Sequence, residues 1–181
     1  KAKKIMIDHH MYPEDFCDVV YSDPEQCSTS QMIFELIDGT GQLALLDQQI
    51  GQALYLGIMT DTGSFRYPSV SSRTHEIVGQ IIQSGVNHAH IHEAVYDSNT
   101  IDRLQLRSHI LANNLELLKD FPVAILFATQ ADMDQFNYQK GDTEGLVNVA
   151  LSVEGVKVAV FFSEQADKVK ISFRSKGDYV V

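Results

Sequence analysis

Apolar residues follow two different spacings along the chain, and the change divides it into two parts. After one short apolar strand, the first part carries apolar residues three or four positions apart, as helices do. In the second part, short apolar runs of strand length appear between helices, and residues 168–174 alternate between polar and apolar. Such alternation is typical of a strand with one solvated or substrate-facing side. The expected strands are 3–7, 123–128, 156–162 and 168–174, and the expected helices are 28–37, 43–59, 72–84, 91–96, 100–119, 131–136 and 145–153.

This order of elements predicts an α/β protein with two domains. Residues 1–98 are expected to form part of a domain with a parallel sheet, in which residues 12–26 are a loop. Residues 99–119 are expected to be a linker helix, and residues 120–181 part of a smaller α/β domain with a mixed sheet.

Composition and charge narrow the range of partners. The 181 residues are 44% hydrophobic and 21% charged, as in ordinary globular proteins. The net charge of −10 argues against binding long duplex nucleic acid, which relies on many Lys and Arg contacts to phosphate. It leaves room for short anionic substrates, because bound divalent cations reverse the local charge.

Cysteine content and hydropathy bear on the compartment. Cys17 and Cys27 are the only cysteines and form no disulfide framework, so we expect free thiols and a cytoplasmic location. No apolar stretch reaches the ~18 residues of a membrane-spanning helix, so we expect no membrane partner.

The segment Asp8-His9-His10 is the first candidate site. It follows the first apolar strand directly, and open α/β sheets bind their ligands at the carboxyl ends of strands. Imidazole and carboxylate groups are ligands of Mn²⁺, Fe²⁺ and Zn²⁺. The alternative is a polar strand end that forms hydrogen bonds with a neighbouring loop.

The second candidate site is the segment from Thr60 to Tyr67, which reads Thr-Asp-Thr-Gly-Ser-Phe-Arg-Tyr. Asp61 offers a carboxylate, Ser64 a hydroxyl, and Arg66 a guanidinium that can hold a phosphate through two hydrogen bonds. Gly63 permits a tight turn. Taken with the first motif, these groups indicate a metal-dependent site that cleaves phosphoesters. The alternative is an ordinary turn after a helix.

These motifs resemble those of the DHH family of phosphoesterases, which takes its name from Asp-His-His. The chain looks most like the bacterial branch that cleaves very short oligoribonucleotides and removes the 3′-phosphate of adenosine 3′,5′-bisphosphate. The resemblance spans nearly the whole chain. It rests on Asp8-His9-His10, Ser28-Thr29-Ser30, residues 60–67, Thr143-Glu144-Gly145-Leu146-Val147-Asn148 and Phe173-Arg174-Ser175-Lys176-Gly177.

The resemblance implies a role for each site residue. His9 and Asp61 would bind the metal pair, with Asp8 as a nearby carboxylate that orients the site. His10 would contact the scissile phosphate or support proton transfer. The later Arg174 and Ser175 would hold the terminal phosphate of the substrate from the family's second domain, the DHH-associated domain.

The family's site includes parts that this chain does not contain. An upstream His, further Asp residues before the Asp-His-His motif, and a glycine-rich segment with a substrate-binding His are all absent from the sequence. We therefore expect the chain to be the middle and later part of a longer enzyme, and to be inactive alone. The complete enzyme is expected to bind two Mn²⁺ ions, with Mg²⁺ or another divalent ion as the alternative.

The leading hypothesis is a phosphodiesterase or phosphatase that acts on short oligoribonucleotides or nucleotides, resembles an exoribonuclease, and has a homodimer as one option for its assembly. A cyclic dinucleotide phosphodiesterase is the alternative within the same class. A catalytically inactive nucleotide-binding module is the alternative from another class, in which Asp8, His9 and Asp61 have only structural roles.

Overall fold

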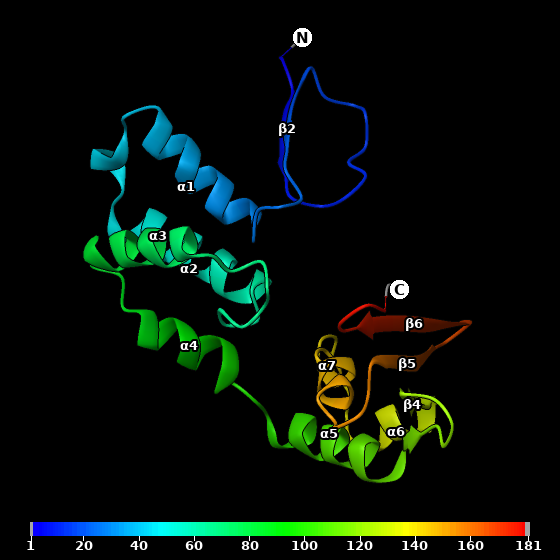
Figure 1. Ribbon diagram of the computed structural model, residues 1–181. Coiled ribbons are helices and arrows are strands. Elements are labelled where there is room, and N and C mark those ends of the chain that lie inside the picture. Colours follow the sequence, from blue (N-terminus) through cyan, green and yellow to red (C-terminus); the bar gives the residue numbers. More distant parts are fainter. Residues whose placement is uncertain (1, 180–181) are drawn as a thin grey trace. The chain divides into compact units, whose positions relative to one another are not determined.

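A computed structural model describes residues 2–179 and contains two compact units, residues 1–98 and 99–181 (Figure 1). Both units mix helices with strands, which confirms the expected α/β class. No helix in residues 2–179 has the length and apolar composition to cross a membrane.

The first unit begins with two parallel strands, β1 and β2, of which the second was not predicted. In their register Ile5 lies opposite Val19 and Asp8 opposite Ser22. Residues 12–26 are therefore not loop throughout, because Val19-Val20-Tyr21 form backbone hydrogen bonds with β1. The elements are β1 (Ile5–Asp8), β2 (Val19–Ser22), α1 (Thr29–Gly39), the 3₁₀ turn η1 (Leu43–Leu45), α2 (Gln48–Asp61), α3 (Ser72–Gln83) and α4 (His88–Tyr96).

Side-chain caps set the starts of the helices in this unit. Ser28 accepts a hydrogen bond from the Gln31 N–H, as the sequence predicts for an N-cap. Asp47 caps α2 by accepting from the Ile50 N–H at 2.9 Å. The expected helix over 43–59 is therefore wrong at its start, because this cap separates η1 from α2, which begins at Gln48. The helices bury a shared core of Phe34, Leu54, Tyr55, Ile58, Met59, Ile77 and Ile81.

The second unit is a four-stranded sheet of order β3-β4-β5-β6, with β4 and β5 parallel and the outer pairs antiparallel. The expected helix over 100–119 is wrong in its second half, because Leu115–Leu117 pair with β4 as a strand. The elements are α5 (Ile101–Asn113), β3 (Leu115–Leu117), β4 (Val123–Ala128), α6 (Gln130–Gln135), α7 (Leu146–Leu151), β5 (Val158–Gln165) and β6 (Lys168–Ser175).

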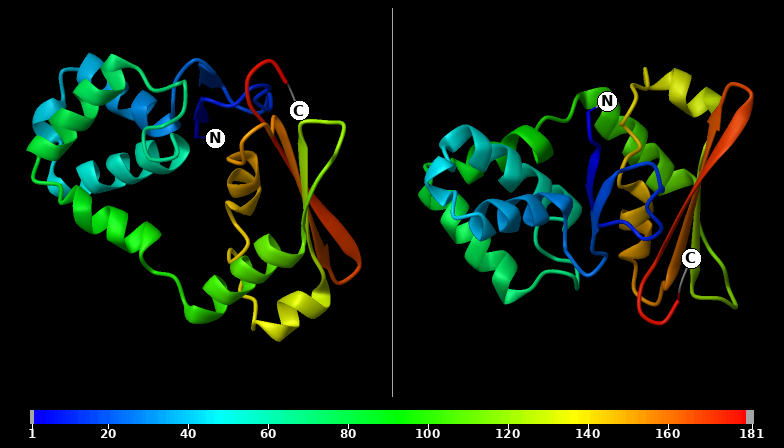
Figure 2. Two further views of the ribbon diagram at one scale, coloured as in Figure 1. Left: turned by 60° about the horizontal axis from the view of Figure 1, so that its bottom comes forward. Right: turned by 90° about the horizontal axis from the view of Figure 1, so that it is seen from above.

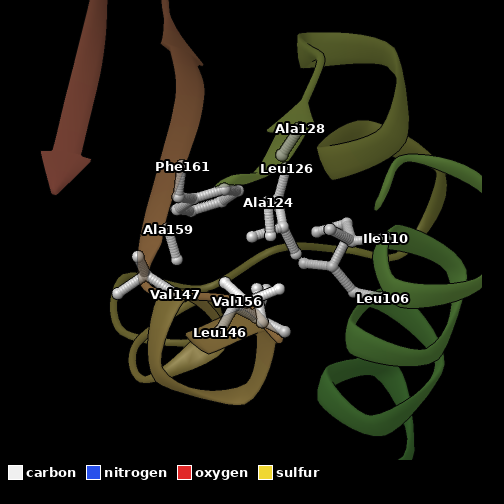
Figure 3. Packing of buried hydrophobic residues seen from close by; sticks show 11 residues of the cluster. Leu106, Ile110, Ala124, Leu126, Ala128, Leu146, Val147, Val156, Ala159 and Phe161 are labelled. Atoms are coloured by element: carbon white, nitrogen blue, oxygen red, sulfur yellow. The ribbon is translucent and has the colours of Figure 1, made fainter. Parts of the chain in front are cut away.

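Helices α5 and α7 lie on the same side of this sheet, as Figure 2 shows. The side chains between helices and sheet are fully or almost fully buried and come from α5, α7, β4 and β5 (Figure 3). Because α5 packs into this core, it belongs to the second compact unit. Strand β6 alternates between polar and apolar residues as the sequence shows, and its apolar residues Val169, Ile171 and Phe173 are each about half exposed.

Asp132 links α5 to α6. One carboxylate oxygen lies 2.8 Å from His109 Nε2. The other accepts from Asn114 Nδ2 and from the N–H and O–H groups of Thr129. Burial raises the pKa of Asp132, but the hydrogen bonds from Thr129 and His109 outweigh it and hold that pKa below its ordinary value of 3.8.

We expect Asp132→Asn to lower the free energy of unfolding by about 1–3 kcal/mol at pH 7, because the charged hydrogen bonds of this carboxylate, including its side of the capping box with Thr129, are weakened or lost. The folded state binds fewer protons at this carboxyl than the unfolded state, so the contribution is complete above the ordinary pKa of 3.8. It disappears as pH falls through the lower pKa of the folded state. Urea unfolding of both proteins from pH 2 to pH 7 measures this difference.

Asp134→Asn is the matched control, because Asp134 lies on the same helix but is exposed, and its carboxylate accepts from Gln130 at 2.7 Å. Its effect should stay within about 0.5 kcal/mol at every pH. A difference between Asp132→Asn and the parent that does not change with pH would contradict the prediction.

Candidate active site

The candidate site of the first unit lies where β1 and α2 end. His9 follows β1 directly, and Asp61 is the last residue of α2. Their side chains meet, with 3.6 Å between His9 Nε2 and Asp61 Oδ2. The two predicted metal ligands, which lie far apart in sequence, are thus neighbours in the fold.

The packing of α1 against both β1 and α2 brings these ends together. Gly57 lets α1 and α2 approach closely, because a Cβ atom at this position would overlap the hydroxyl of Ser30. The Ser28-Thr29-Ser30 segment therefore has two structural roles. Ser28 caps α1, and Ser30 fits against the glycine of α2.

Asp8 and His10 form a second pair. His10 Nδ1 lies 2.7 Å from Asp8 Oδ1, and the backbone N–H of His10 donates to the same oxygen. These two hydrogen bonds hold the pKa of Asp8 below its ordinary value of 3.8, and the one from the His10 side chain has the larger effect. The carboxyl group of Asp8 is therefore anionic at neutral pH.

The geometry of His9 and Asp61 fits two ligands of one divalent ion. Metal–ligand bonds of about 2.0–2.2 Å place two donor atoms of one ion about 3–3.5 Å apart. The separation of 3.6 Å is close to this range. Across residues 2–179, however, no group of three His, Cys, Asp or Glu side chains converges on one point. His9 and Asp61 could thus supply two ligands, and the described residues place no third such side chain with them.

Arg66 lies beyond a tight turn that follows Asp61. Its Nε donates to the carbonyl of Gly63 at 2.7 Å, which fixes the guanidinium plane and leaves both Nη groups of an exposed side chain for an anion. Ser64 lies in the turn itself, with a φ of 62°.

The two candidate residues of the second unit lie on β6. Arg174 is opposite Ala159 and Ser175 opposite Val158. Successive strand residues point to opposite faces, so these two side chains leave β6 on opposite faces of the sheet. The Ser175 hydroxyl donates to the carbonyl of Tyr179, whereas one Nη group of Arg174 donates to its neighbour Phe173.

The segment 143–148 leads into helix α7. Gly145, with a φ of 80°, is the residue before α7, and no side chain caps this helix. The carbonyl of Glu144 accepts instead from the guanidinium of Arg107 on α5.

Sequence reasoning missed the role of Thr62, which is fully buried beside the site. The motif contained a signal for it, since a Thr directly after the last residue of an apolar helix is suited to bond the final carbonyls.

Comparison with known proteins supports the family resemblance, although no protein-family model matches the chain. The bifunctional oligoribonuclease and PAP phosphatase NrnA of Bacillus subtilis is 27% identical over 180 residues, which make up 99% of this chain and 56% of that protein. The structure of an exopolyphosphatase-related protein from Bacteroides fragilis is 38% identical with a TM-score of 0.92, and the match covers 97% of this chain and 51% of that one. The chain is a relative of the DHH-family phosphoesterases.

Another relative is named for a different activity. The cyclic-di-AMP phosphodiesterase GdpP of Geobacillus thermodenitrificans is 27% identical in an alignment of 186 positions. This alignment covers 96% of this chain and 26% of that protein. The chain spans about half the length of the curated NrnA relative, since the match covers 56% of that protein.

We expect Gly57→Ala to destabilise the first unit by about 1–3 kcal/mol, because the added methyl group overpacks the contact with Ser30. Gly79→Ala is the matched control, since Gly79 also lies inside a helix but has open space around its Cβ position. The control should stabilise the protein by about 0.5–1 kcal/mol through helix propensity. Thermal unfolding of both variants checks the opposite signs, and stabilisation by both substitutions would refute the close contact.

Proposed function

We propose that the full-length protein is a metal-dependent phosphoester hydrolase that removes nucleotides from an end of short oligoribonucleotides and dephosphorylates adenosine 3′,5′-bisphosphate. The observation that carries this proposal is the contact between His9 and Asp61, at 3.6 Å. It occurs in a chain that is similar over 99% of its length to an oligoribonuclease and PAP phosphatase.

His9 and Asp61 are the proposed ligands of a divalent ion, with Mn²⁺ as the expected metal and Mg²⁺ as the alternative. Asp8, one residue from His9 in the sequence, is the proposed carboxylate that orients the site, and its pKa is lowered by its hydrogen bonds with His10. When bound, such ions activate water and offset the negative charge of the reacting phosphate. Further ligands are proposed to complete the coordination, because among residues 2–179 no third His, Cys, Asp or Glu side chain lies with His9 and Asp61.

His10 is the proposed partner of the scissile phosphate or of the proton that is transferred. Its side chain is 76% exposed, so a substrate can reach it, and the bond from Nδ1 to Asp8 fixes the ring. This bond leaves Nε2 directed away from the carboxylate, as in other oriented catalytic histidines. Asp8 is thus the positioning group and His10 the group that meets the substrate.

Arg66 is the proposed phosphate ligand within the first unit, with the Ser64 hydroxyl beside it. Arg174 is the proposed ligand of the terminal phosphate in the second unit. The hydroxyl of Ser175 already donates to the carbonyl of Tyr179, so its contact with the same phosphate stays a prediction. Arginine suits both positions because its planar group binds phosphate oxygens in pairs.

Two other functions have specific support. The similarity to a cyclic-di-AMP phosphodiesterase favours a cyclic dinucleotide as the second candidate substrate. The two-residue ligand set fits a nucleotide-binding module without catalysis. Assays of the full-length protein distinguish all three, because only the two enzymes release product. A cytoplasmic location and a homodimer stay predictions.

We expect Asp61→Asn to reduce Mn²⁺-dependent hydrolysis of a 5′-phosphorylated diribonucleotide at least about 100-fold in the full-length protein, because a charged metal ligand becomes neutral. Product release followed by chromatography measures kcat/KM. Asp47→Asn is the matched control at the other end of α2, since Asn caps helices as well as Asp does. Equal activity of Asp61→Asn and the parent would refute the metal assignment.

We expect Arg66→Lys to raise KM for the same substrate about tenfold, since lysine keeps the charge but loses both the paired contact and the bond to Gly63. Arg66→Met should have a larger effect, because it also loses the charge. Steady-state kinetics gives the order of the variants. If Arg66→Met matches the parent, Arg66 does not bind the substrate.

A further inference from the structure

Three consecutive residues after Asp61 adopt left-handed backbone angles. The φ angles are 56° at Gly63, 62° at Ser64 and 63° at Phe65. Glycine adopts such angles readily, whereas residues with a Cβ atom are disfavoured there by steric repulsion. Strained turns of this kind persist only where surrounding contacts hold them.

The hydroxyl of Thr62 supplies the central contact. It donates to the carbonyl of Ile58 at 2.6 Å, in the last turn of α2, and accepts from the N–H of Phe65 at 3.0 Å. Thr62 is fully buried, so water does not replace either partner. One hydroxyl thus joins the end of α2 to the last residue of the left-handed turn.

Other contacts close the turn around Thr62. The N–H of Ser64 donates to the carbonyl of Met59, and the N–H groups of Arg66 and Tyr67 both donate to the carbonyl of Thr62. The backbone N–H groups of residues 64–67 are therefore used inside the turn. The turn itself is not an anion-binding loop, and its role must lie in what it positions.

The ring of Phe65 anchors the turn in the core. It meets Tyr55 edge to face, with 5.7 Å between ring centroids, and packs against the buried cluster of the first unit. Tyr55 is held in turn by His92 of α4, with 3.1 Å between the hydroxyl and Nε2. The turn is therefore fixed at its start by Thr62 and at its end by Phe65.

The turn lies between two residues of the proposed site. Asp61 precedes Thr62 and lies 3.6 Å from His9. Arg66 follows Phe65, and its Nε donates to the carbonyl of Gly63 within the turn. The direction in which the chain leaves α2 thus sets the placement of the carboxylate and of the guanidinium together.

We propose that Thr62 is a positioning residue for this site, and that its buried hydroxyl holds the left-handed turn which places Asp61 and Arg66. The inference rests on the proposed function for the roles of these two residues. It does not require Thr62 to touch substrate or metal.

The test compares Thr62→Val with Thr62→Ser in the full-length protein. Valine keeps the volume and loses the hydroxyl, and serine keeps the hydroxyl. Thr60→Val is the matched control, because the hydroxyl of Thr60 also bonds carbonyls of α2, those of Leu56 and Gly57, but does not reach the turn. Three quantities are measured for each protein. They are the hydrogen exchange rate of the Phe65 amide, the Mn²⁺ affinity from the electron paramagnetic resonance signal of free Mn²⁺, and kcat/KM for the diribonucleotide.

We expect Thr62→Val to exchange the Phe65 amide at least about tenfold faster than the parent, since its acceptor is lost. The same variant should bind Mn²⁺ about tenfold more weakly and lose about 10–100-fold in kcat/KM, because small misplacement of reacting groups has large effects. Thr62→Ser should stay within about threefold of the parent in all three measurements. Thr60→Val should match the parent.

Several results would overturn the inference. They are an unchanged Phe65 amide in Thr62→Val, faster exchange without any change in Mn²⁺ affinity and kcat/KM, or equal losses in Thr62→Val and Thr62→Ser. If Thr62→Val does not fold, the exchange rate of the Phe65 amide in the parent protein tests the inference. Fast exchange there would rule out the hydrogen bond to Thr62. If the parent hydrolyses no phosphoester, the proposed function fails. Exchange and Mn²⁺ affinity then still test the role of Thr62.

Discussion

The direct contact between α1 and α2 at Gly57 and Ser30 is the constraint on which the site depends. Helix α1 packs on β1, whose end carries the Asp8-His9-His10 segment, and α2 ends at Asp61. A side chain at Gly57 would separate the two helices, because its Cβ position overlaps the Ser30 hydroxyl. The site thus depends on the close approach of α1 and α2, in which the backbone of Gly57 contacts the side chain of Ser30.

The polar groups of the first unit then divide into pairs with different environments. Asp8 and His10 bond one another at the exposed end of β1, and this bond lowers the pKa of Asp8. His9 and Asp61 approach without a short hydrogen bond, at 3.6 Å, which leaves their donor atoms for a shared ion. The net charge of −10 disfavours an anionic ligand at this place, and a bound divalent cation would reverse the local charge.

The candidate phosphate ligand of the second unit lies on an edge strand. Its core lies between one face of the sheet and helices α5 and α7, and Arg174 belongs to β6 at the edge. The hydrogen bonds of Asp132 link α5 to the start of α6. The guanidinium of Arg174 donates to the carbonyl of its neighbour Phe173.

Several features followed from the sequence alone. The α/β class, the start of helix α1 at Ser28, and the strands β4, β5 and β6 follow from local periodicity and capping chemistry, which act within a few residues. Asp-His-His and the Asp61 segment indicated metal chemistry because their side chains are metal and phosphate ligands. The tertiary structure alone decided the rest. Strand β2 forms by pairing with β1, β3 by pairing with β4, and the left-handed turn by burial of Thr62 and Phe65. These depend on partners distant along the chain or on the shape of a core, and no local pattern encodes either. The separation of His9 and Asp61 has the same origin, since it is set by helix packing at a glycine.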